Sequence, residues 1–172
     1  MLRPTERWNW SYCHTRERLL LDLSDEAQFC TPFAAVQLLY LPQSQALSMA
    51  EAEAFWAIEH SLQALELAPA VRLELALTAL SCQFLQQQAH KSWYFQQGAA
   101  QYSAALHDVI VLRGLSSQCA LVVGAEPDCV SCLLLGELDT LSGKTLTRLS
   151  VIRVLRNRVS ALDAAIPYRH SA

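Results

Sequence analysis

A glycine, a lysine and a threonine stand in the order found at phosphate-binding loops, in the segment Ser142-Gly143-Lys144-Thr145. Such a loop needs another glycine five residues before Gly143, so that backbone amides can wrap a phosphate. Leu138 occupies that position, and the nearest glycine, Gly136, comes two residues too early. The sequence therefore does not predict nucleotide hydrolysis.

A pair of cysteines, Cys129 and Cys132, has the CxxC spacing of many metal sites. The pair lies in an apolar run, from Cys129 to Leu135, whose pattern predicts a strand. Residues three apart on a strand point to opposite faces, so one metal ion could not easily bind both thiolates. The sequence has no second CxxC pair and no His-x-x-x-His motif. No metal site and no cofactor are predicted.

The histidines are scattered, and none belongs to a nucleophile or metal motif. They stand at positions 14, 60, 90, 107 and 170. His107 and Asp108 are adjacent on a predicted strand, so their side chains should point apart. With no catalytic residues to name, we expect that the protein is not an enzyme.

Composition places the chain among folded cytoplasmic proteins. Its 172 residues are 52% hydrophobic, which is ample for a core. The start of the sequence lacks the apolar stretch of a secretory signal, and no apolar run approaches the ~18 residues that a membrane helix needs. Six cysteines dispersed through apolar segments fit a reducing compartment. A net charge of -3 does not favour nucleic acid as a partner. Residues 143–172 hold six basic side chains against one acidic, which indicates an acidic partner or a solvated face.

The first part of the chain has the pattern of a small antiparallel sheet. Trp8, Trp10 and Tyr12 alternate with polar residues, which predicts a strand that pairs in a hairpin with residues 19–23. Residues 28–31 predict a third strand, and Pro32 favours an edge position for it.

Two helices are then expected. Ser48 and Glu51 form a capping-box signature before a helical apolar stripe that ends at Leu65. Pro69 suits the first turn of a second helix, running to about Gln88, which is apolar on two faces and should be enclosed. We expect residues 91–95 to return to the sheet as a strand.

The pattern changes beyond Gly98 to short strands separated by glycines and a proline. Strands are predicted at 109–112, 120–123, 129–135 and 145–149, forming an antiparallel sheet or a partly closed barrel, and an amphipathic helix at 150–162. The predicted fold class is α+β, with an N-terminal α/β domain at residues 1–97 and a smaller C-terminal domain at residues 98–172.

Two cationic residues stand out as candidates for partner contact. Lys91 opens the run Lys91-Ser92-Trp93-Tyr94-Phe95 and is the only Lys or Arg between Arg72 and Arg113. Trp93 and one neighbouring aromatic are expected in the core, because strand side chains alternate. On the predicted last helix, Arg158 either lays its stem along the apolar face or holds a guanidinium at the mouth of a pocket. These residues fit a binding protein, including a cytoplasmic adaptor or small-ligand module with an aromatic cleft.

Taken together, the sequence resembles the ZapC family of bacterial cell-division proteins. The residues that carry the resemblance, in chain order, are Trp8-Asn9-Trp10-Ser11-Tyr12, Arg18-Leu19-Leu20-Leu21-Asp22-Leu23, Glu74-Leu75-Ala76-Leu77-Thr78-Ala79-Leu80, Lys91-Ser92-Trp93-Tyr94-Phe95, Cys132-Leu133-Leu134 and Leu155-Arg156-Asn157-Arg158. Their collinear order covers nearly the whole chain.

The resemblance implies a non-enzymatic cytoplasmic protein of the midcell division ring. It implies direct binding to polymers of the tubulin-like GTPase FtsZ and their lateral bundling, which stabilises the ring. It also implies a twisted β-barrel-like C-terminal domain, and it makes Leu21, Lys91 and Arg158 the partner-binding candidates. Bundling requires contact with two filaments, through two surfaces or through weak self-association. No nucleic acid and no membrane insertion are implied.

Overall fold

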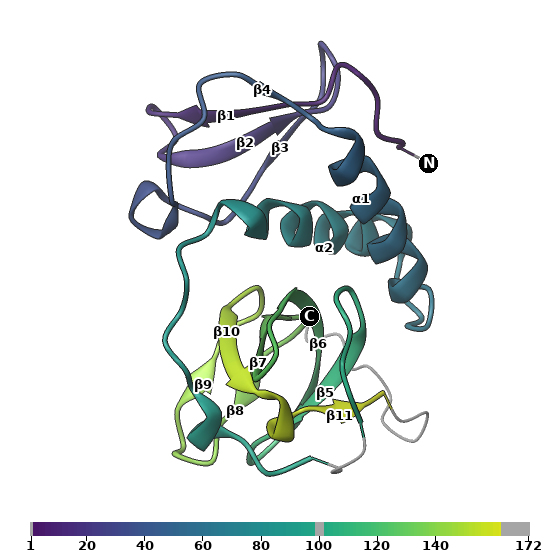
Figure 1. Cartoon of the computed structure of the whole chain (residues 1–172). Coiled ribbons are helices and arrows are strands. Elements are labelled where there is room, and N and C mark those ends of the chain that lie inside the picture. The colour runs from purple at the N-terminus through teal and green to yellow at the C-terminus, as the bar shows by residue number, and fades with distance from the viewer. Residues whose placement is uncertain (1, 99–101, 163–172) are drawn as a thin grey trace. The chain divides into compact units, whose positions relative to one another are not determined.

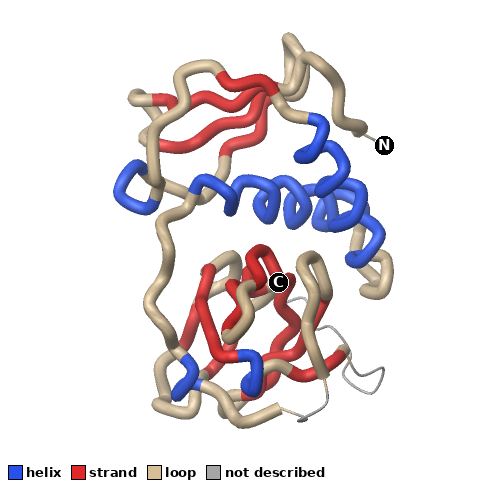
Figure 2. The backbone as a smooth tube through the Cα atoms, in the orientation of Figure 1, coloured by secondary structure: helices blue, strands red, loops and turns tan. Residues whose placement is uncertain are grey.

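The structure is a computed structural model that describes residues 2–98 and 102–162. The chain divides into two compact units. The first unit comprises Met1–Glu59 and Pro69–Gln86, and the second comprises His60–Ala68 and Gln87–Ala172. Helices gather in the first unit, and the second is built mainly of strands (Figures 1 and 2). The α+β class is confirmed, while the division into domains at residues 1–97 and 98–172 stays a prediction.

The sheet of the first unit has the predicted hairpin at its centre. Its strands are β1 (Asn9–Cys13), β2 (Arg18–Asp22), β3 (Gln28–Cys30) and β4 (Gln45–Ala46), in the order β3-β2-β1-β4. All three pairings are antiparallel, and Trp10 lies opposite Leu21 in the hairpin. Strand β3 lies at the edge, as Pro32 predicts.

Two tryptophans, Trp8 just before β1 and Trp10 within it, are buried in the core. Trp8 and Trp10 are 1% and 0% exposed, and their rings make edge contacts with Phe55 and Phe84 at centroid distances of 5.5 and 5.1 Å. Edge-to-face packing of this kind adds to the stabilisation from burial. These contacts between the first strand and the helical segment therefore form part of the core of the first unit.

Helix α1 (Met49–Leu62) begins at the predicted capping box. The Ser48 hydroxyl accepts a hydrogen bond from the Glu51 amide at 3.1 Å, and the Ser48 amide donates to Glu51 Oε2 at 2.6 Å. Glu51 Oε1 also accepts from Trp10 Nε1, at 2.7 Å, and from Gln83 Nε2. One buried carboxylate therefore caps the helix and holds it to β1.

The second half of helix α2 (Pro69–Ser81) is enclosed, since every residue from 75 to 81 is buried, whereas residues 69–74 are exposed or half-buried. It ends seven residues earlier than predicted, in the 3₁₀ turn η2 (Cys82–Phe84). The backbone of residues 84–86 instead pairs with residues 37–39, since the Leu39 amide donates to Phe84 and the Gln86 amide to Gln37. These hydrogen bonds require an extended backbone at residues 84–86. The helical pattern of the sequence therefore placed the end of α2 too late.

The second unit contains an open antiparallel sheet. Its strands are β5 (Val109–Arg113), β6 (Ser117–Ala125), β7 (Cys129–Leu134), β10 (Val151–Leu155) and β11 (Ser160–Ala161), in the order β10-β7-β6-β5-β11. The first three lie where the sequence predicts them. Strands β8 (Leu138–Asp139) and β9 (Thr145–Leu146) form a separate hairpin. Within the described residues β10 and β11 do not pair with each other, so the barrel-like expectation is not confirmed.

The predicted helix at 150–162 is wrong. Residues 151–155 form β10, which pairs with β7, and a 3₁₀ turn, η4 (Arg156–Arg158), leads into β11. The burial alternates, with Ile152 and Val154 inside, and β-branched residues favour such a strand. When this five-residue strand and the turn after it are taken as one segment, the spacing of their apolar residues resembles that of an amphipathic helix. The strand predicted at 145–149 is limited to β9.

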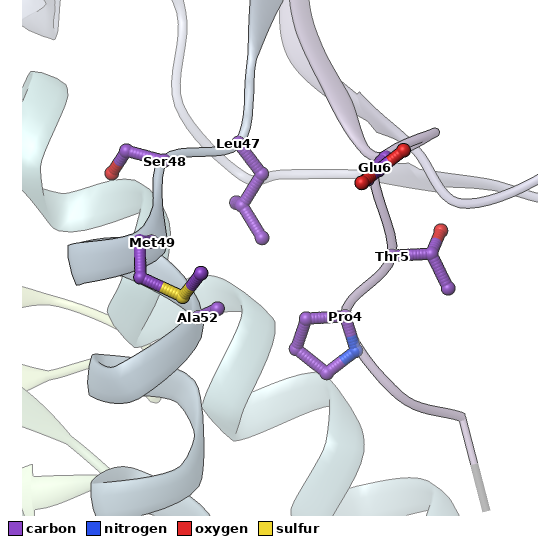
Figure 3. Close-up of a pocket in the computed structure, with 7 residues that line it drawn as sticks. All are labelled: Pro4, Thr5, Glu6, Leu47, Ser48, Met49 and Ala52. Atoms are coloured by element: carbon purple, nitrogen blue, oxygen red, sulfur yellow. The ribbon is translucent and has the colours of Figure 1, made fainter.

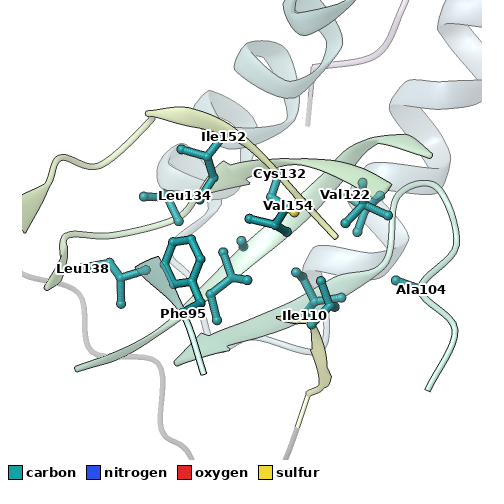
Figure 4. Close-up of a cluster of buried hydrophobic side chains, with 13 residues drawn as sticks. Phe95, Ala104, Ile110, Val122, Cys132, Leu134, Leu138, Ile152 and Val154 are labelled. Atoms are coloured by element: carbon teal, nitrogen blue, oxygen red, sulfur yellow. The ribbon is translucent and has the colours of Figure 1, made fainter. Parts of the chain in front are cut away.

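The core of the second unit lies against this sheet (Figure 4). Its buried members are Phe95, Ala104, Ile110, Leu112, Ala120, Val122, Val130, Cys132, Leu134, Leu138, Ile152, Val154 and Val159. Phe95 comes from outside the sheet, and Gly98 permits the chain to pass close to β11, because a Cβ there would lie 2.3 Å from the Val159 carbonyl oxygen.

Substitution of Glu51 by alanine should lower the free energy of unfolding by about 2 to 4 kcal/mol. It removes a helix cap and leaves the buried Trp10 indole N–H without its acceptor. Chemical denaturation followed by circular dichroism measures the loss. Glu53→Ala, on the exposed face of the same helix, is the control and should change stability by less than about 0.5 kcal/mol. Equal losses in the two variants would contradict the proposed link.

Candidate partner-binding site

The aromatic run at residues 91–95 belongs to the second unit and is not a strand. Ser92–Tyr94 forms the 3₁₀ turn η3, closed by hydrogen bonds from Tyr94 N to Lys91 O and from Phe95 N to Ser92 O. The predicted return to the N-terminal sheet is therefore wrong. The Lys91 amide pairs with the edge of β10, and the Tyr94 and Phe95 amides close the turn. A local sequence pattern could not reveal these partners.

Hydrogen bonds on both sides of the run fix it to the second unit. The Lys91 amide donates to the Arg153 carbonyl at 2.8 Å, and the Leu155 amide donates to Ser92 Oγ at 2.9 Å. Beyond the run, the Gly98 amide donates to the Asn157 carbonyl at 2.7 Å. Residues 91–98 therefore lie alongside β10 and η4 and have little freedom to move away from them.

The aromatic side chains of the run divide between core and surface. Phe95 is 1% exposed and lies in the core, Tyr94 packs half-buried against it, and Trp93 is 61% exposed. The expectation of Trp93 in the core is wrong, because a 3₁₀ turn spaces side chains by about 120° and does not alternate them. The turn places Trp93 on the outer side.

Lys91 lies against the two outer rings. Its ammonium nitrogen is 5.6 Å from the centroid of Trp93 and 5.8 Å from that of Tyr94. Both distances are within the range of a cation–π interaction. Within the described residues no carboxylate forms an ion pair with Lys91. The cation rests on an aromatic surface and keeps its charge available to a partner.

Arg158 lies beside the same run, although not on a helix. In η4 its Nη1 donates to the Phe95 carbonyl at 3.3 Å, and the side chain is half-buried. Its Nε is buried and has no hydrogen-bond partner among the described residues. Two of the three candidates, Lys91 and Arg158, are thus brought to opposite ends of one five-residue run.

Leu21, the third candidate, lies in the first unit and is 0% exposed. It is the fourth residue of the five in β2, paired with Trp10 on one side and with Phe29 on the other. A residue in this place contributes to packing of the sheet. Any influence of Leu21 on a partner would act through the shape of the strands around it.

In the glycine-lysine-threonine segment, Gly143 and Lys144 lie in the turn between β8 and β9, and Thr145 begins β9, where a phosphate-binding loop would lead into a helix. Gly143 has φ of +84°, a conformation that favours glycine, and the Thr140 hydroxyl donates to the Lys144 carbonyl at 2.7 Å. The conformation and hydrogen bonds of the hairpin turn therefore account for these residues, and no bound phosphate is needed to explain them.

The CxxC cysteines are both buried in β7. Burial raises the pKa of the Cys132 thiol to about 12. Burial and the carboxylate of Glu126 also raise the pKa of Cys129, although Arg153 Nε lies 3.1 Å from its sulfur. Residues 2–98 and 102–162 contain no group of three His, Cys, Asp or Glu side chains that could hold a metal ion.

Two surface features of the first unit could not be predicted from the sequence. Apolar side chains are exposed in the loop after β3, at Val36, Leu39, Tyr40 and Leu41. A cavity of about 240 Å³ lies at the start of α1, between the N-terminal segment and the helix (Figure 3). It is lined by Pro4, Thr5, Glu6, Leu47, Ser48, Met49 and Ala52. Neither segment carries a periodic pattern, so exposure could not be predicted.

Comparison with known proteins connects this architecture to a family. The model for the N-terminal part of the cell-division protein ZapC matches residues 1–87, and the model for its C-terminal part matches residues 87–165. The chain belongs to the ZapC family of cell-division proteins. The two family models meet at residue 87, where the chain passes from the first compact unit to the second.

Relatives of similar length carry the same name. The cell division protein ZapC of Pseudoalteromonas translucida is 30% identical over 170 residues, which cover 94% of each chain. That of Shewanella woodyi is 28% identical and covers 96% of this chain and 94% of its own. That of Musicola paradisiaca is 26% identical, with 99% and 95% covered. In the described part of the chain, neither helix has the length and apolarity needed to cross a membrane.

The thiols should differ sharply in reactivity. In native protein, Ellman's reagent should modify the exposed Cys30 first and the half-buried Cys13 more slowly. The remaining four, Cys82, Cys119, Cys129 and Cys132, are buried and should react only after unfolding. Mass spectrometry of peptides at successive times measures the order. Early modification of Cys129 would contradict its assignment as a structural thiol.

Proposed function

We propose that this protein binds polymers of FtsZ directly and promotes their lateral bundling, so that it stabilises the division ring at midcell, in the cytoplasm. Membership of the ZapC family supports a role in cell division. The observation that carries the proposal is the Lys91–Arg158 region, in which two cationic side chains flank an exposed aromatic residue on a fixed backbone. Such a surface suits a protein partner with acidic and apolar groups.

The chemistry of the described residues favours binding over catalysis. Carboxylates that lie near cations are used in structure: Glu126 pairs with Arg153, and Glu59 pairs with Arg72 at 2.9 Å. Glu51 caps a helix. Glu126 lies 3.1 Å from the sulfur of Cys129, but that thiol is buried and its pKa is raised, which does not suit a nucleophile. We therefore propose a non-enzymatic function.

Bundling requires that the protein join two filaments. A single protein can do so with two separate surfaces, or it can pair with a second copy that holds the other filament. We propose Lys91 and Arg158 as direct contacts in the second unit, and Leu21 as a residue that shapes a contact surface of the first unit. If the protein instead pairs with a second copy, weak self-association would take the place of one of these two surfaces.

A small-ligand or adaptor function is the second candidate, and the cavity at the start of α1 favours it. Its volume of about 240 Å³ and its lining by Leu47, Met49 and Pro4 suit one apolar side chain or a small apolar molecule. Light scattering of FtsZ in GTP separates the two candidates. Scattering should rise on addition of the protein if it bundles polymers, and it should stay flat if the protein is only an adaptor.

Charge reversal at the second unit should release the protein from FtsZ polymers. Lys91→Glu and Arg158→Glu should each weaken cosedimentation at least about tenfold, because each places a negative charge against an acidic partner. Lys144→Glu is the matched control: it changes the other lysine of the chain, which is exposed in the β8–β9 turn, and binding should be nearly unchanged.

Thermal unfolding should show that the three variants fold as well as the wild-type protein. If folded Lys91→Glu and Arg158→Glu both pellet like wild type, the site is wrongly placed. If the wild-type protein itself fails to pellet with polymers, the proposed function is wrong.

Binding should weaken as salt is added. The Debye length falls from about 30 Å at 0.01 M ionic strength to about 8 Å at 0.15 M, so attraction between exposed charges is screened. Cosedimentation at several salt concentrations measures the dependence. The dependence should be smaller for Lys91→Met than for wild type, since one charge of the contact is missing; equal dependence would contradict an electrostatic role for Lys91.

A further inference from the structure

Trp93 is the most exposed tryptophan of the chain and has no structural task that explains its size. It is 61% exposed, against 1% for Trp8, 0% for Trp10 and 41% for Trp56. Exposed tryptophan leaves a large apolar area in water, and tryptophan is enriched among the residues that dominate protein–protein binding energy. The side chain is available for contact without any rearrangement of the core.

The backbone under Trp93 is unusually well fixed for a surface turn. Ser92 is 7% exposed and its hydroxyl accepts from Leu155, while Phe95 anchors the other end in the core. The Tyr94 carbonyl accepts from the Leu141 amide at 2.9 Å. A partner that contacts Trp93 would therefore lose little conformational entropy in ordering the turn.

Lys91 is restrained by the same ring. A free lysine side chain loses rotamer entropy when it is fixed. Contact with the faces of Trp93 and Tyr94, at 5.6 and 5.8 Å, restricts the ammonium before a partner arrives. Arg153 and Arg72, in contrast, are already paired with carboxylates. The charge of Lys91 has no such partner among the described residues, so the surface is complementary to an acidic group.

We propose that Trp93 is the apolar anchor of the FtsZ contact, and that its ring, with that of Tyr94, positions the Lys91 ammonium for an acidic side chain on the filament. This inference rests on the proposed function. It identifies the chemistry of the partner surface, a carboxylate beside an apolar side chain. It also makes Trp93 and Lys91 one energetic unit rather than two independent contacts.

A double-mutant cycle on the full chain tests the coupling. Affinity for FtsZ polymers in GTP is titrated for wild type, Lys91→Met, Trp93→Leu and the double variant. Trp93→Leu should weaken binding about tenfold in the wild-type background, as expected of an anchor. In the Lys91→Met background it should weaken binding only about threefold, because the cation–π contact is already lost. Trp93→Phe, which keeps an aromatic face, should retain most of the affinity.

Fluorescence gives a readout that a purely structural role would not change. In a Trp56→Phe background, acrylamide should quench mainly Trp93, since Trp8 and Trp10 are buried. The same protein with Trp93→Phe, mixed with the same polymers, provides the signal to subtract. Trp93 should become protected from quenching when polymers are added.

The outcomes separate this inference from the function on which it rests. Absence of wild-type binding would overturn the proposed function and this inference with it. Wild-type binding with normal affinity of Trp93→Leu, or with Trp93 equally quenched on the polymer, would overturn the anchor alone. Equal losses from Trp93→Leu in the two backgrounds would overturn the positioning of Lys91. Lys144→Met should bind normally, and a loss equal to that of Lys91→Met would show that net charge alone matters.

Discussion

The backbone groups on the outer edge of β10 need hydrogen-bond partners, and the segment that supplies those partners carries the candidate site. An unpaired strand edge invites association with other strands. Here the Arg153 carbonyl is met by the Lys91 amide, and the Leu155 amide is met by the Ser92 hydroxyl. A short 3₁₀ turn lies along the edge in place of another strand. The position of each side chain in the aromatic run follows from that choice.

The 3₁₀ turn places the side chains of neighbouring residues in different environments. Phe95 stabilises the core of the second unit, and Trp93 with Lys91 forms an amphipathic surface outside it. Arg158 donates to the backbone of the same run from η4. Because the surface residues are held by the core through the backbone, the site is rigid without being buried. That combination suits recognition of a large partner, which reaches only what lies outside.

Two carboxylates, the buried Glu51 and the exposed Glu126, link separate segments of the structure. Glu51 joins a helix cap to the indole of Trp10, and Glu126 joins Arg153 to Cys129. Buried polar groups need such partners, since an unsatisfied one costs about 1 to 3 kcal/mol. Around the two cores stabilised in this way, the proposed binding surface lies outside the core of the second unit.

The sequence by itself determined the α+β class, the first hairpin, the start of each helix and strands β5 to β7. Those features depend on local patterns: alternation at Trp8 and Trp10, a cap at Ser48, and short β-branched runs. It also singled out Lys91 by its isolation, whereas Arg158 was singled out from its place on a predicted helix that does not form. Only the tertiary structure decided that residues 150–162 are not a helix, that Trp93 faces outward, and that Lys91 and Arg158 flank one run. The reason is physical: these outcomes depend on hydrogen bonds between segments about 60 residues apart, such as Ser92 to Leu155, and a local pattern carries no information about which distant backbone group will be the partner.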